Sequence, residues 1–378
     1  MKILTVRSSM PANGPSTQSL TIAKTMKSNG HELEFVTSGG AYSETVRESG
    51  FVVHIVPGLA HNRRDPLNVG RAIFSLSSVI RTFRPDVIHG HNAAATVCSV
   101  LAGYLAGRRV PCVTSVRGVE ERSTHQWRNR VWKRTPGLLL GVCEKTRDRL
   151  LSFGVQPEKI RVTYNGADLK RFNPFLYDGE AQKEILGLAD KIVVGSTGAM
   201  TGPENLEGPS KGQHVLIRAV AKLSEKHDNL AILFVGDGPR RGQLERMAKE
   251  YGISDNVVFA GQRWDVPEML SAMDIYCLPS IWGEFFPNSI IEAMAMKKPW
   301  IGSDIAGLSE LTANNRAGWV TPPGDVNALA SNLEKLLFDR NERDFRGLAA
   351  REEVEEKFSS DKVCQAIMGA YREALAYS

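Results

Sequence analysis

The stretch Glu284-Phe-Phe-Pro-Asn-Ser-Ile-Ile-Glu-Ala-Met-Ala-Met296 carries two carboxylates, one before a predicted helix and one inside it. Apolar residues recur at helical spacing after Pro287, and proline followed by asparagine suits a helix start. Backbone N–H groups at such a start lack partners and attract anions. A carboxylate beside an anion site holds phosphate poorly, but it accepts hydrogen bonds from sugar hydroxyls. We therefore predict a nucleotide-sugar site, with Glu284 in the loop and Glu292 about one turn into the helix.

The length and composition are those of an ordinary globular protein. The chain has 378 residues, of which 42% are hydrophobic and 24% are charged, and this length suits two domains with separate cores. Its apolar runs are too short to cross a bilayer, and the alternating residues 1–6 predict a first strand rather than a signal peptide. The five cysteines are scattered without metal-ligand spacing, which indicates free thiols in a reducing cytoplasm.

The net charge of +5 is unevenly distributed along the chain. Residues 1–180 have an excess of Lys and Arg, whereas residues 181–378 have an excess of Asp and Glu. The densest basic segment is Arg122–Arg134, which also contains Trp127 and Trp132. This segment suits an anionic membrane surface or an acidic acceptor. An equally weighted alternative is a solvated helix face with its tryptophans in the core, and nucleic acid is disfavoured because no reading motif accompanies the segment.

Short β-rich runs alternate with helical periodicity along both halves of the chain. This alternation predicts an α/β fold of two doubly wound, Rossmann-like domains that face a central cleft. A Pro- and Gly-containing linker at 173–179 separates domain 1–172 from domain 173–358, and a last helix follows in 359–378. The expected strands are 3–7, 32–37, 52–56, 87–89, 112–115, 138–142, 160–163, 192–196, 230–235, 257–260, 275–278 and 300–302.

Three glycine-containing turns of the second half follow predicted strands. Gly236 and Gly238 permit a tight turn before a helix, although many strand-to-helix turns look alike. Gly198 ends the first strand of this half, and a polar loop then leads to Lys211. A lysine beside a helix start suits a diphosphate, since its charge and the helix dipole act on the same anion. The alternative for Lys211 is an ordinary surface lysine. Gly261 and Arg263 end another strand, where a nucleobase edge can bind.

In the first half, candidate residues also follow strands. Gly14 lies in the loop after the first strand, and Arg117 follows the fifth. Of His89 and His91, we expect only His91 to reach the cleft, because it is nearer the carboxyl end of its strand. A metal site is disfavoured because the pair lacks a third ligand. Phosphate-loop, dinucleotide and Gly-x-Ser-x-Gly fingerprints are absent from the sequence.

Together these motifs resemble glycosyltransferase family 4 (glycosyl transferases group 1), retaining enzymes of the GT-B fold, over almost the full chain. The segments that carry the resemblance are Pro85–His89, Tyr164–Asp168, Lys211-Gly212, Val235–Pro239, Pro279-Ser280, Glu284…Glu292, Gly307…Glu310 and Pro323–Asp325.

The resemblance implies a role for each predicted site residue. Domain 1–172 would bind the acceptor and domain 173–358 the donor, while the helix in 359–378 would return to the first domain. Glu284 would contact hydroxyls of the donor sugar, Glu292 would hold the ribose, and Lys211 would neutralise the leaving diphosphate. No metal or cofactor would be required. The remaining implied contacts are backbone amides at Phe286, Asn288 and Ser289, and the border of the base at Arg263.

Two positions depart from the family pattern. The family usually has an arginine after Gly198, where this chain has Ala199, and a histidine where it has Arg117. Losing one preorganised cation costs on the order of several kcal/mol of transition-state stabilisation. We hypothesise that Arg117 restores the missing charge, whereas His91 either orients a substrate or is simply a strand-end histidine.

The predicted function is retaining transfer of a sugar from a nucleoside diphosphate, UDP before GDP, to a hydroxyl acceptor in cell-surface polysaccharide or glycolipid synthesis. The predicted location is the cytoplasm, at the inner face of the cell membrane. The alternatives are a nucleotide-sugar epimerase or phosphorylase with the same fold, and an inactive nucleotide-sugar-binding protein. The donor sugar, the acceptor and the oligomeric state do not follow from the sequence.

Overall fold

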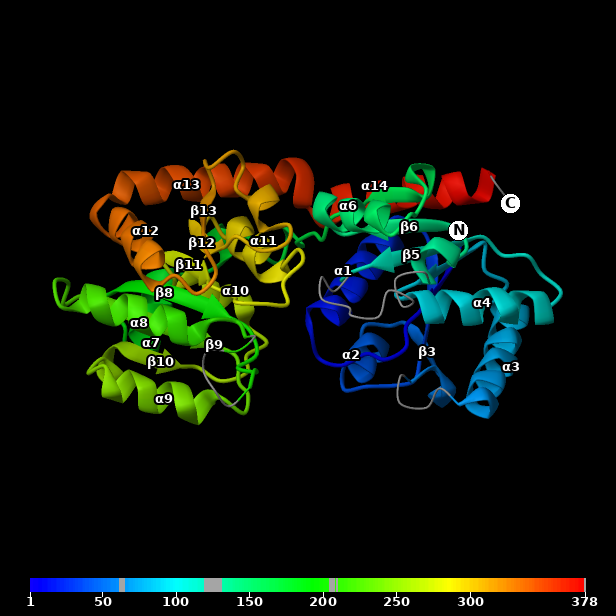
Figure 1. The fold of residues 1–378 in the computed structure, drawn as a ribbon, viewed down its shortest axis with the longest axis horizontal. Coiled ribbons are helices and arrows are strands. Elements are labelled where there is room, and N and C mark those ends of the chain that lie inside the picture. Colours follow the sequence, from blue (N-terminus) through cyan, green and yellow to red (C-terminus); the bar gives the residue numbers. More distant parts are fainter. Residues whose placement is uncertain (61–64, 119–130, 204–207, 209, 377–378) are drawn as a thin grey trace. The chain divides into compact units, whose positions relative to one another are not determined.

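The computed structural model describes residues 1–378 except 61–64, 119–130, 204–207, 209 and 377–378 (Figure 1). The chain forms two compact units. Unit 1 comprises Met1–Asn165 with Ser360–Ser378, and unit 2 comprises Gly166–Ser359. Most of the basic segment Arg122–Arg134 lies outside the described residues. Among the residues that are described, no helix is long and apolar enough to cross a membrane.

Unit 1 contains a seven-stranded parallel sheet in the order β3-β2-β1-β4-β5-β6-β7. Its strands are β1 (Lys2–Val6), β2 (Glu32–Thr37), β3 (Val52–Ile55), β4 (Val87–Gly90), β5 (Cys112–Val116), β6 (Leu138–Gly141) and β7 (Ile160–Val162). Its helices and 3₁₀ turns are α1 (Gly14–Ser28), α2 (Tyr42–Glu48), η1 (Pro57–Leu59), α3 (Pro66–Phe83), α4 (Ala93–Leu105), α6 (Glu144–Ser152), η3 (Pro157–Lys159) and α14 (Ser360–Ala376).

Two cores cover the two faces of this sheet, because successive strand residues point to opposite sides. Ile3 packs with α1 and α14, whereas Leu4 packs with α3 and α4. The C-terminal helix thus completes the core of unit 1, as the resemblance implies. Strand order reverses between β1 and β4, so the carboxyl ends of these two strands lie at a switch point, where ligands of α/β proteins bind.

Unit 2 repeats the design with six parallel strands in the order β10-β9-β8-β11-β12-β13, and its switch point lies between β8 and β11. Its strands are β8 (Ile192–Thr197), β9 (Leu230–Val235), β10 (Val257–Phe259), β11 (Ile275–Leu278), β12 (Trp300–Ser303) and β13 (Gly318–Thr321). Its helical elements are η4 (Pro174–Leu176), α7 (Gly179–Ile185), α8 (Gln213–Ser224), α9 (Arg241–Glu250), η5 (Ser254–Asn256), α10 (Val266–Ser271), α11 (Asn288–Ala295), η6 (Leu308–Leu311), α12 (Val326–Phe338), α13 (Arg340–Glu353) and the π-helical turn Val354–Phe358.

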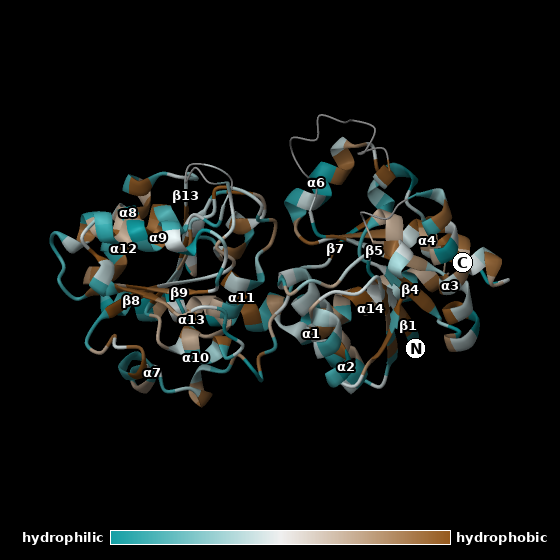
Figure 2. Cartoon of the chain, turned by 90° about the horizontal axis from the view of Figure 1, so that it is seen from below, coloured by the Kyte–Doolittle hydropathy of each residue, from teal (hydrophilic) through white to brown (hydrophobic). Residues whose placement is uncertain are grey.

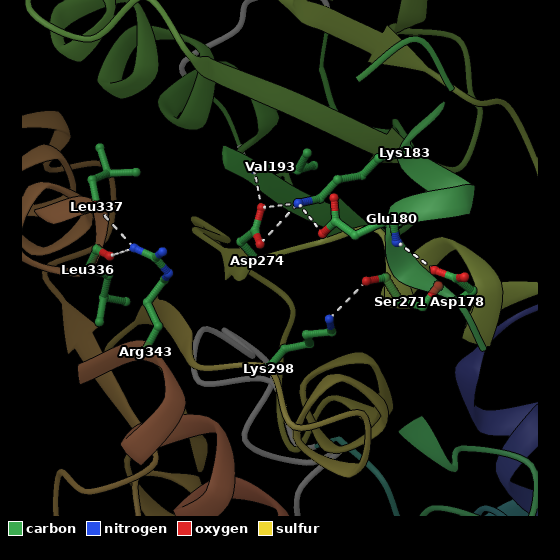
Figure 3. Close-up of polar contacts among 10 residues, drawn as sticks. All are labelled: Asp178, Glu180, Lys183, Val193, Ser271, Asp274, Lys298, Leu336, Leu337 and Arg343. Atoms are coloured by element: carbon green, nitrogen blue, oxygen red, sulfur yellow. Dashed lines mark hydrogen bonds and ion pairs between the residues drawn. The ribbon is translucent and has the colours of Figure 1, made fainter. Parts of the chain in front are cut away.

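A buried polar network anchors α7 in unit 2 (Figure 3). The ammonium of Lys183 lies 3.0 Å from the Asp274 carboxylate, which also accepts a hydrogen bond from the Val193 N–H at 2.8 Å. Nearby, Lys298 donates to the Ser271 carbonyl at 3.0 Å, and burial lowers the pKa of Lys298 to about 8. The predicted linker at 173–179 therefore leads directly into a part of unit 2, and the compact units divide earlier, at Asn165 and Gly166.

All the predicted strands are observed, with small differences at some of their ends, and unit 2 has one further strand, β13, that is not among the predicted ones. The sequence suggests Pro287 as the first residue of α11, but Pro287 lies directly before that helix, which begins at Asn288. Similarly, Gly14 is the first residue of α1 rather than a loop residue, because Asn13 caps that helix by accepting from the Ser16 N–H. Such shifts are typical of helix termini, where capping side chains decide the last residue.

Candidate functional site

The carboxylate of Glu284 and the ammonium of Lys211 form an ion pair at the switch point of unit 2. Only 7% of Glu284 is exposed, and its Oε1 also accepts a hydrogen bond from the Ser280 hydroxyl at 3.0 Å. The two loops that carry the pair are joined where the Ile281 N–H donates to the Ser210 carbonyl at 2.9 Å. Two residues that the sequence placed in separate roles are thus direct partners.

Gly212 allows the Lys211 loop to approach the loop after β11. Its φ is +72°, and a Cβ atom built there would lie 1.8 Å from the carbonyl oxygen of Pro279. Any other residue at this position would combine backbone strain with a collision against a main-chain atom. Gly212 therefore allows Lys211 to lie just before α8 and to face Glu284.

The start of α11 lies beside this ion pair in sequence, and polar groups surround it. Pro287 provides no side-chain cap. The buried hydroxyl of Tyr276 hydrogen bonds with the Ser289 side chain and lies 2.9 Å from the Thr197 hydroxyl, and burial raises the pKa of Tyr276. Backbone N–H groups of an uncapped helix start form an anion site. Asn288 and Ser289 are the first residues of that helix.

Glu292 is partly buried on α11, and burial raises the pKa of its carboxyl group to about 7, with the positive charge of Arg171 acting in the opposite direction. A carboxyl group with this pKa is divided between its neutral and charged forms at neutral pH. Groups that donate hydrogen bonds, such as ribose hydroxyls, favour the charged form. The charge of Glu292 is therefore sensitive to hydrogen-bond donors beside it.

The predicted glycines of unit 2 support the loop after β8. A Cβ atom at Gly236 would lie 2.1 Å from the Gly198 carbonyl oxygen, and one at Gly238 would lie 2.5 Å from the Met200 carbonyl oxygen. The turn after β9 therefore packs directly against the loop that leads to Lys211. Ala199, where the family usually has arginine, is exposed in this loop.

Arg263 and Phe286 have partners within unit 2. The guanidinium of Arg263 pairs with the Asp265 carboxylate, at 2.8 Å between Nε and Oδ1. Phe286 is buried and packs edge-to-face on Phe358, with ring centroids 5.4 Å apart. The side chain of Phe286 is therefore part of the core, and only its backbone is available for the predicted contact.

Unit 1 gathers histidines and arginines at its own switch point. The rings of His89 and His91 stack at 4.5 Å within 12° of parallel. His89 is buried, and its nitrogens hydrogen bond with Tyr371 Oη at 2.6 Å and Ser115 Oγ at 2.7 Å, so it is structural. His91 lies just past the end of β4, and its buried Nδ1 has no partner. That His91 is the histidine that reaches a ligand stays a prediction.

Arg7 and Arg117 follow β1 and β5, the two strands that flank β4 in the sheet. Arg7 is buried and donates to the Pro15 carbonyl at 2.9 Å, whereas Arg117 donates to Asn165 Oδ1 at 3.1 Å and has a buried Nε without a partner. Burial, together with the charge of Arg7, lowers the pKa of Arg117 to about 9.

The charges of both arginines also affect the pKa values of the two histidines. Burial first, and then the charges of Arg117 and Arg7, lower the pKa of His89 to about 3. Burial, followed by His89, Arg7 and Arg117, lowers the pKa of His91 well below its usual value. Across the described residues, neither Arg7 nor Arg117 pairs with a carboxylate, and no cluster of His, Cys, Asp and Glu could hold a metal ion. Within the part of the chain that the structure describes, the charges of Arg7 and Arg117 are thus not balanced by an acid, a condition that favours an anionic ligand.

Three residues of these sites were not predicted from the sequence. Arg7 could have been found, since it directly follows a strand at the switch point, as Arg117 does. Tyr276 lies in a buried strand and reads as a core residue until its hydrogen bonds are known. Arg171 acts on Glu292 from a distant part of the sequence, for which no local signal exists.

Comparison with known proteins identifies the family. A model of glycosyl transferases group 1 matches residues 207–353, and a model of Glycosyltransferase Family 4 matches residues 12–171. The chain therefore belongs to these glycosyltransferases, and its two sheets form the GT-B fold.

Individual relatives are similar over much of the chain. N-acetyl-alpha-D-glucosaminyl L-malate synthase of Bacillus anthracis is 24% identical over 94% of this chain and 92% of its own length. UDP-Gal:alpha-D-GlcNAc-diphosphoundecaprenol alpha-1,3-galactosyltransferase of Escherichia coli is 26% identical over 71% of each chain. The structure of Anabaena HepE in complex with UDP superposes with a TM-score of 0.84 over 99% of this chain and 100% of HepE, at 22% identity.

Proposed function

We propose that this glycosyltransferase moves a sugar from UDP to a hydroxyl group of a polysaccharide or glycolipid precursor, with retention of the anomeric configuration. The observation that carries the proposal is the Lys211–Glu284 pair beside the start of α11. UDP is favoured as the carrier because HepE was crystallised with UDP and the Escherichia coli relative is named for UDP-Gal.

The pair supplies two chemical functions to a bound donor. When diphosphate arrives, its oxygens compete with Glu284 for the ammonium of Lys211, because both are anions at the same cation. Glu284, once released, accepts hydrogen bonds from sugar hydroxyls. Lys211 and the N–H groups of α11 then stabilise the negative charge that develops as the sugar–phosphate bond breaks. The acceptor hydroxyl attacks on the same face, and the leaving phosphate takes its proton.

The cation cluster of unit 1 supports an anionic acceptor. Arg7 and Arg117 offer positive charge without a carboxylate beside them in the described part of the chain, and Arg117 and His91 each have a buried nitrogen without a partner. The acceptor of the Escherichia coli relative is, by its name, a diphosphoundecaprenol-linked sugar, and the Bacillus anthracis relative is named for L-malate, so both carry negative charge. We propose an acceptor with a phosphate or carboxylate group near the reacting hydroxyl.

The first experiment is a thermal-shift screen of UDP, GDP and their sugars on the full chain, followed by NMR of the product. The proposal expects UDP and one UDP-sugar to raise the melting temperature, and the product to keep the donor's anomeric configuration. Activity is expected to persist in EDTA, because Lys211 and α11 supply the charge. An inverted product, or preference for GDP, would contradict the proposal.

Two alternative functions give different results in the same assay. An epimerase would convert a UDP-sugar without any acceptor. An inactive binding protein would be stabilised by UDP but would transfer sugar to no acceptor. Ala199 is the observation that favours this second alternative, since the usual arginine is missing there.

A further inference from the structure

Tyr276 is a fully buried tyrosine of β11, at the switch point of unit 2. It pairs with Gly195 of β8 across that point. Ile275 and Cys277 belong to the same core as α8, so Tyr276 points to the opposite face of the sheet. The strands of this unit form a hydrophobic layer, drawn in brown in Figure 2. A phenylalanine would fill the same place without a polar atom, so the hydroxyl is the feature that needs an explanation.

The hydroxyl of Tyr276 connects two segments of the donor site. It lies 2.9 Å from the Thr197 hydroxyl and also hydrogen bonds with the Ser289 side chain. Thr197 is the last residue of β8, directly before the loop that leads to Lys211. Ser289 is the second residue of α11. One buried oxygen atom thus joins the end of a central strand to the start of the helix.

The three hydroxyl groups can arrange their hydrogens in two ways. Tyr276 has a single hydrogen, so it donates either to Ser289 or to Thr197. Burial raises the pKa of Tyr276, and the phenol therefore keeps its hydrogen at neutral pH. When Tyr276 donates to Ser289, the hydrogen of the Ser289 hydroxyl is left for another acceptor. An anion beside Ser289 stabilises this arrangement, in which Thr197 donates to Tyr276 and the hydrogen bonds strengthen one another.

Ser289 is the member of this chain that a ligand can reach from α11. It is partly exposed, whereas Tyr276 is completely buried. The N–H groups of the first helical turn have no partner within the helix, so the hydroxyl and the main-chain N–H of Ser289 can contact one phosphate group together. Hydrogen bonds to charged acceptors are stronger than those between neutral groups. The hydroxyl is therefore suited to add to the anion site of α11.

We propose that Tyr276 positions the Ser289 hydroxyl as a hydrogen-bond donor to the diphosphate of the sugar donor. This inference rests on the proposed function, because the anion is the nucleotide carrier. Ser289 contacts the leaving group, and Tyr276 is a positioning residue that acts through Ser289. The bond adds to the contributions of Lys211 and α11 as negative charge develops on the phosphate.

The test compares the affinity for UDP with that for uridine, which has the same base and ribose but no phosphate. Ser289→Ala is expected to weaken UDP binding about tenfold and Tyr276→Phe about fivefold, with uridine binding unchanged in both. Ser289→Thr keeps a hydroxyl and should bind UDP like the wild type. Because Tyr276 acts through Ser289, the double variant Tyr276→Phe/Ser289→Ala should lose no more than Ser289→Ala alone. Isothermal titration with UDP, and displacement of UDP by uridine, measure these affinities.

Thr321→Val is the matched control. Thr321 is buried in β13, and its hydroxyl donates to the Gly302 carbonyl at 3.3 Å. The variant therefore loses a buried hydroxyl of unit 2 that is not part of the chain of three. Its affinity for UDP is expected to equal that of the wild type.

The inference is overturned if Tyr276→Phe binds UDP like the wild type. It is also overturned if UDP and uridine are weakened equally, since the hydroxyl would then act on the nucleoside or on the fold. A wild type that binds UDP but transfers no sugar contradicts the proposed function alone, and the comparison of UDP with uridine still decides the role of Tyr276. A wild type that binds neither UDP nor GDP overturns both. If GDP is the carrier, GDP and guanosine replace UDP and uridine, because the diphosphate is common to both.

Discussion

The two units use the same sheet design but treat charge in opposite ways at their switch points. Unit 2 pairs its cation with an acid, since Lys211 and Glu284 neutralise each other. Unit 1 collects Arg7, Arg117 and two histidines without an acidic partner among the described residues. The comparison indicates that an anionic ligand of unit 2 must displace Glu284 from Lys211. In unit 1, the described residues offer no acid to balance Arg7 and Arg117, so an anion can bind there without displacing one.

The largest expected effect is that of Lys211→Ala. Turnover should fall by about 10²–10³-fold, because a preorganised cation at the developing phosphate charge is lost. UDP affinity should also fall, since Glu284 then remains as an unpaired buried carboxylate beside the phosphate. Steady-state kinetics and UDP titration measure both effects. Lys249→Ala, an exposed lysine on α9, is the control. Turnover near that of the wild type would remove Lys211 from the mechanism.

Glu284→Gln separates the two functions of the pair. Turnover should fall by roughly 10²-fold because the hydrogen-bond acceptor for the sugar is weakened. UDP itself should bind more tightly, because its phosphates no longer have to displace the carboxylate of Glu284 from Lys211. Isothermal titration with UDP and rates with UDP-sugar distinguish the effects. Weaker UDP binding in this variant would show that diphosphate does not compete with Glu284.

Arg117→Ala tests the cluster of unit 1. We expect turnover to fall at least about tenfold, because the variant lacks a cation that stabilises an anionic group during the reaction. Rates at varied donor and acceptor, together with UDP affinity, show which substrate is affected. Arg109→Ala, an exposed arginine away from the cluster, is the control. Turnover near wild type with intact donor binding would contradict the hypothesis that Arg117 replaces the missing arginine at Ala199.

The smallest effect is a pH dependence from Glu292. Burial raises its pKa to about 7, so the group is largely protonated below that pH. Ribose hydroxyls donate to the carboxylate form, and UDP affinity should therefore rise between about pH 6 and pH 8, by up to roughly tenfold, with release of a proton. Titrations in buffers of different ionisation enthalpy measure that proton.

The variant Glu292→Gln provides the control, and its UDP affinity should be nearly independent of pH. Because burial raises the folded-state pKa of Glu292 above its unfolded-state pKa, the charged carboxylate destabilises the free protein. This destabilisation is absent below the unfolded-state pKa and grows as the pH rises to about 7. The variant should therefore be more stable than wild type at pH 8, by on the order of 1 kcal/mol. Equal stability at that pH would show that Glu292 is not significantly desolvated.

Much of the fold could be predicted because its signals are local. Several strands, such as β2 and β9, begin and end where the pattern of apolar residues predicts, and some helices, such as α1 and α3, start after a capping residue. Pairings between distant residues were not predictable. Lys211 and Glu284 carry no sequence signal for their ion pair, and Tyr371 completes the hydrogen bonding of His89 from the last helix.

By itself, the sequence determined the alternation of strands and helices, the turns that need glycine and the helix that follows Pro287. These features depend on periodicity and on the backbone conformations of neighbouring residues. Only the tertiary structure decided which charges are compensated. Packing brought Glu284 to Lys211 and left Arg7 and Arg117 without an acid in the described chain. The reason is physical: desolvation and charge pairing depend on what lies nearby in space, and distance along the chain does not report it.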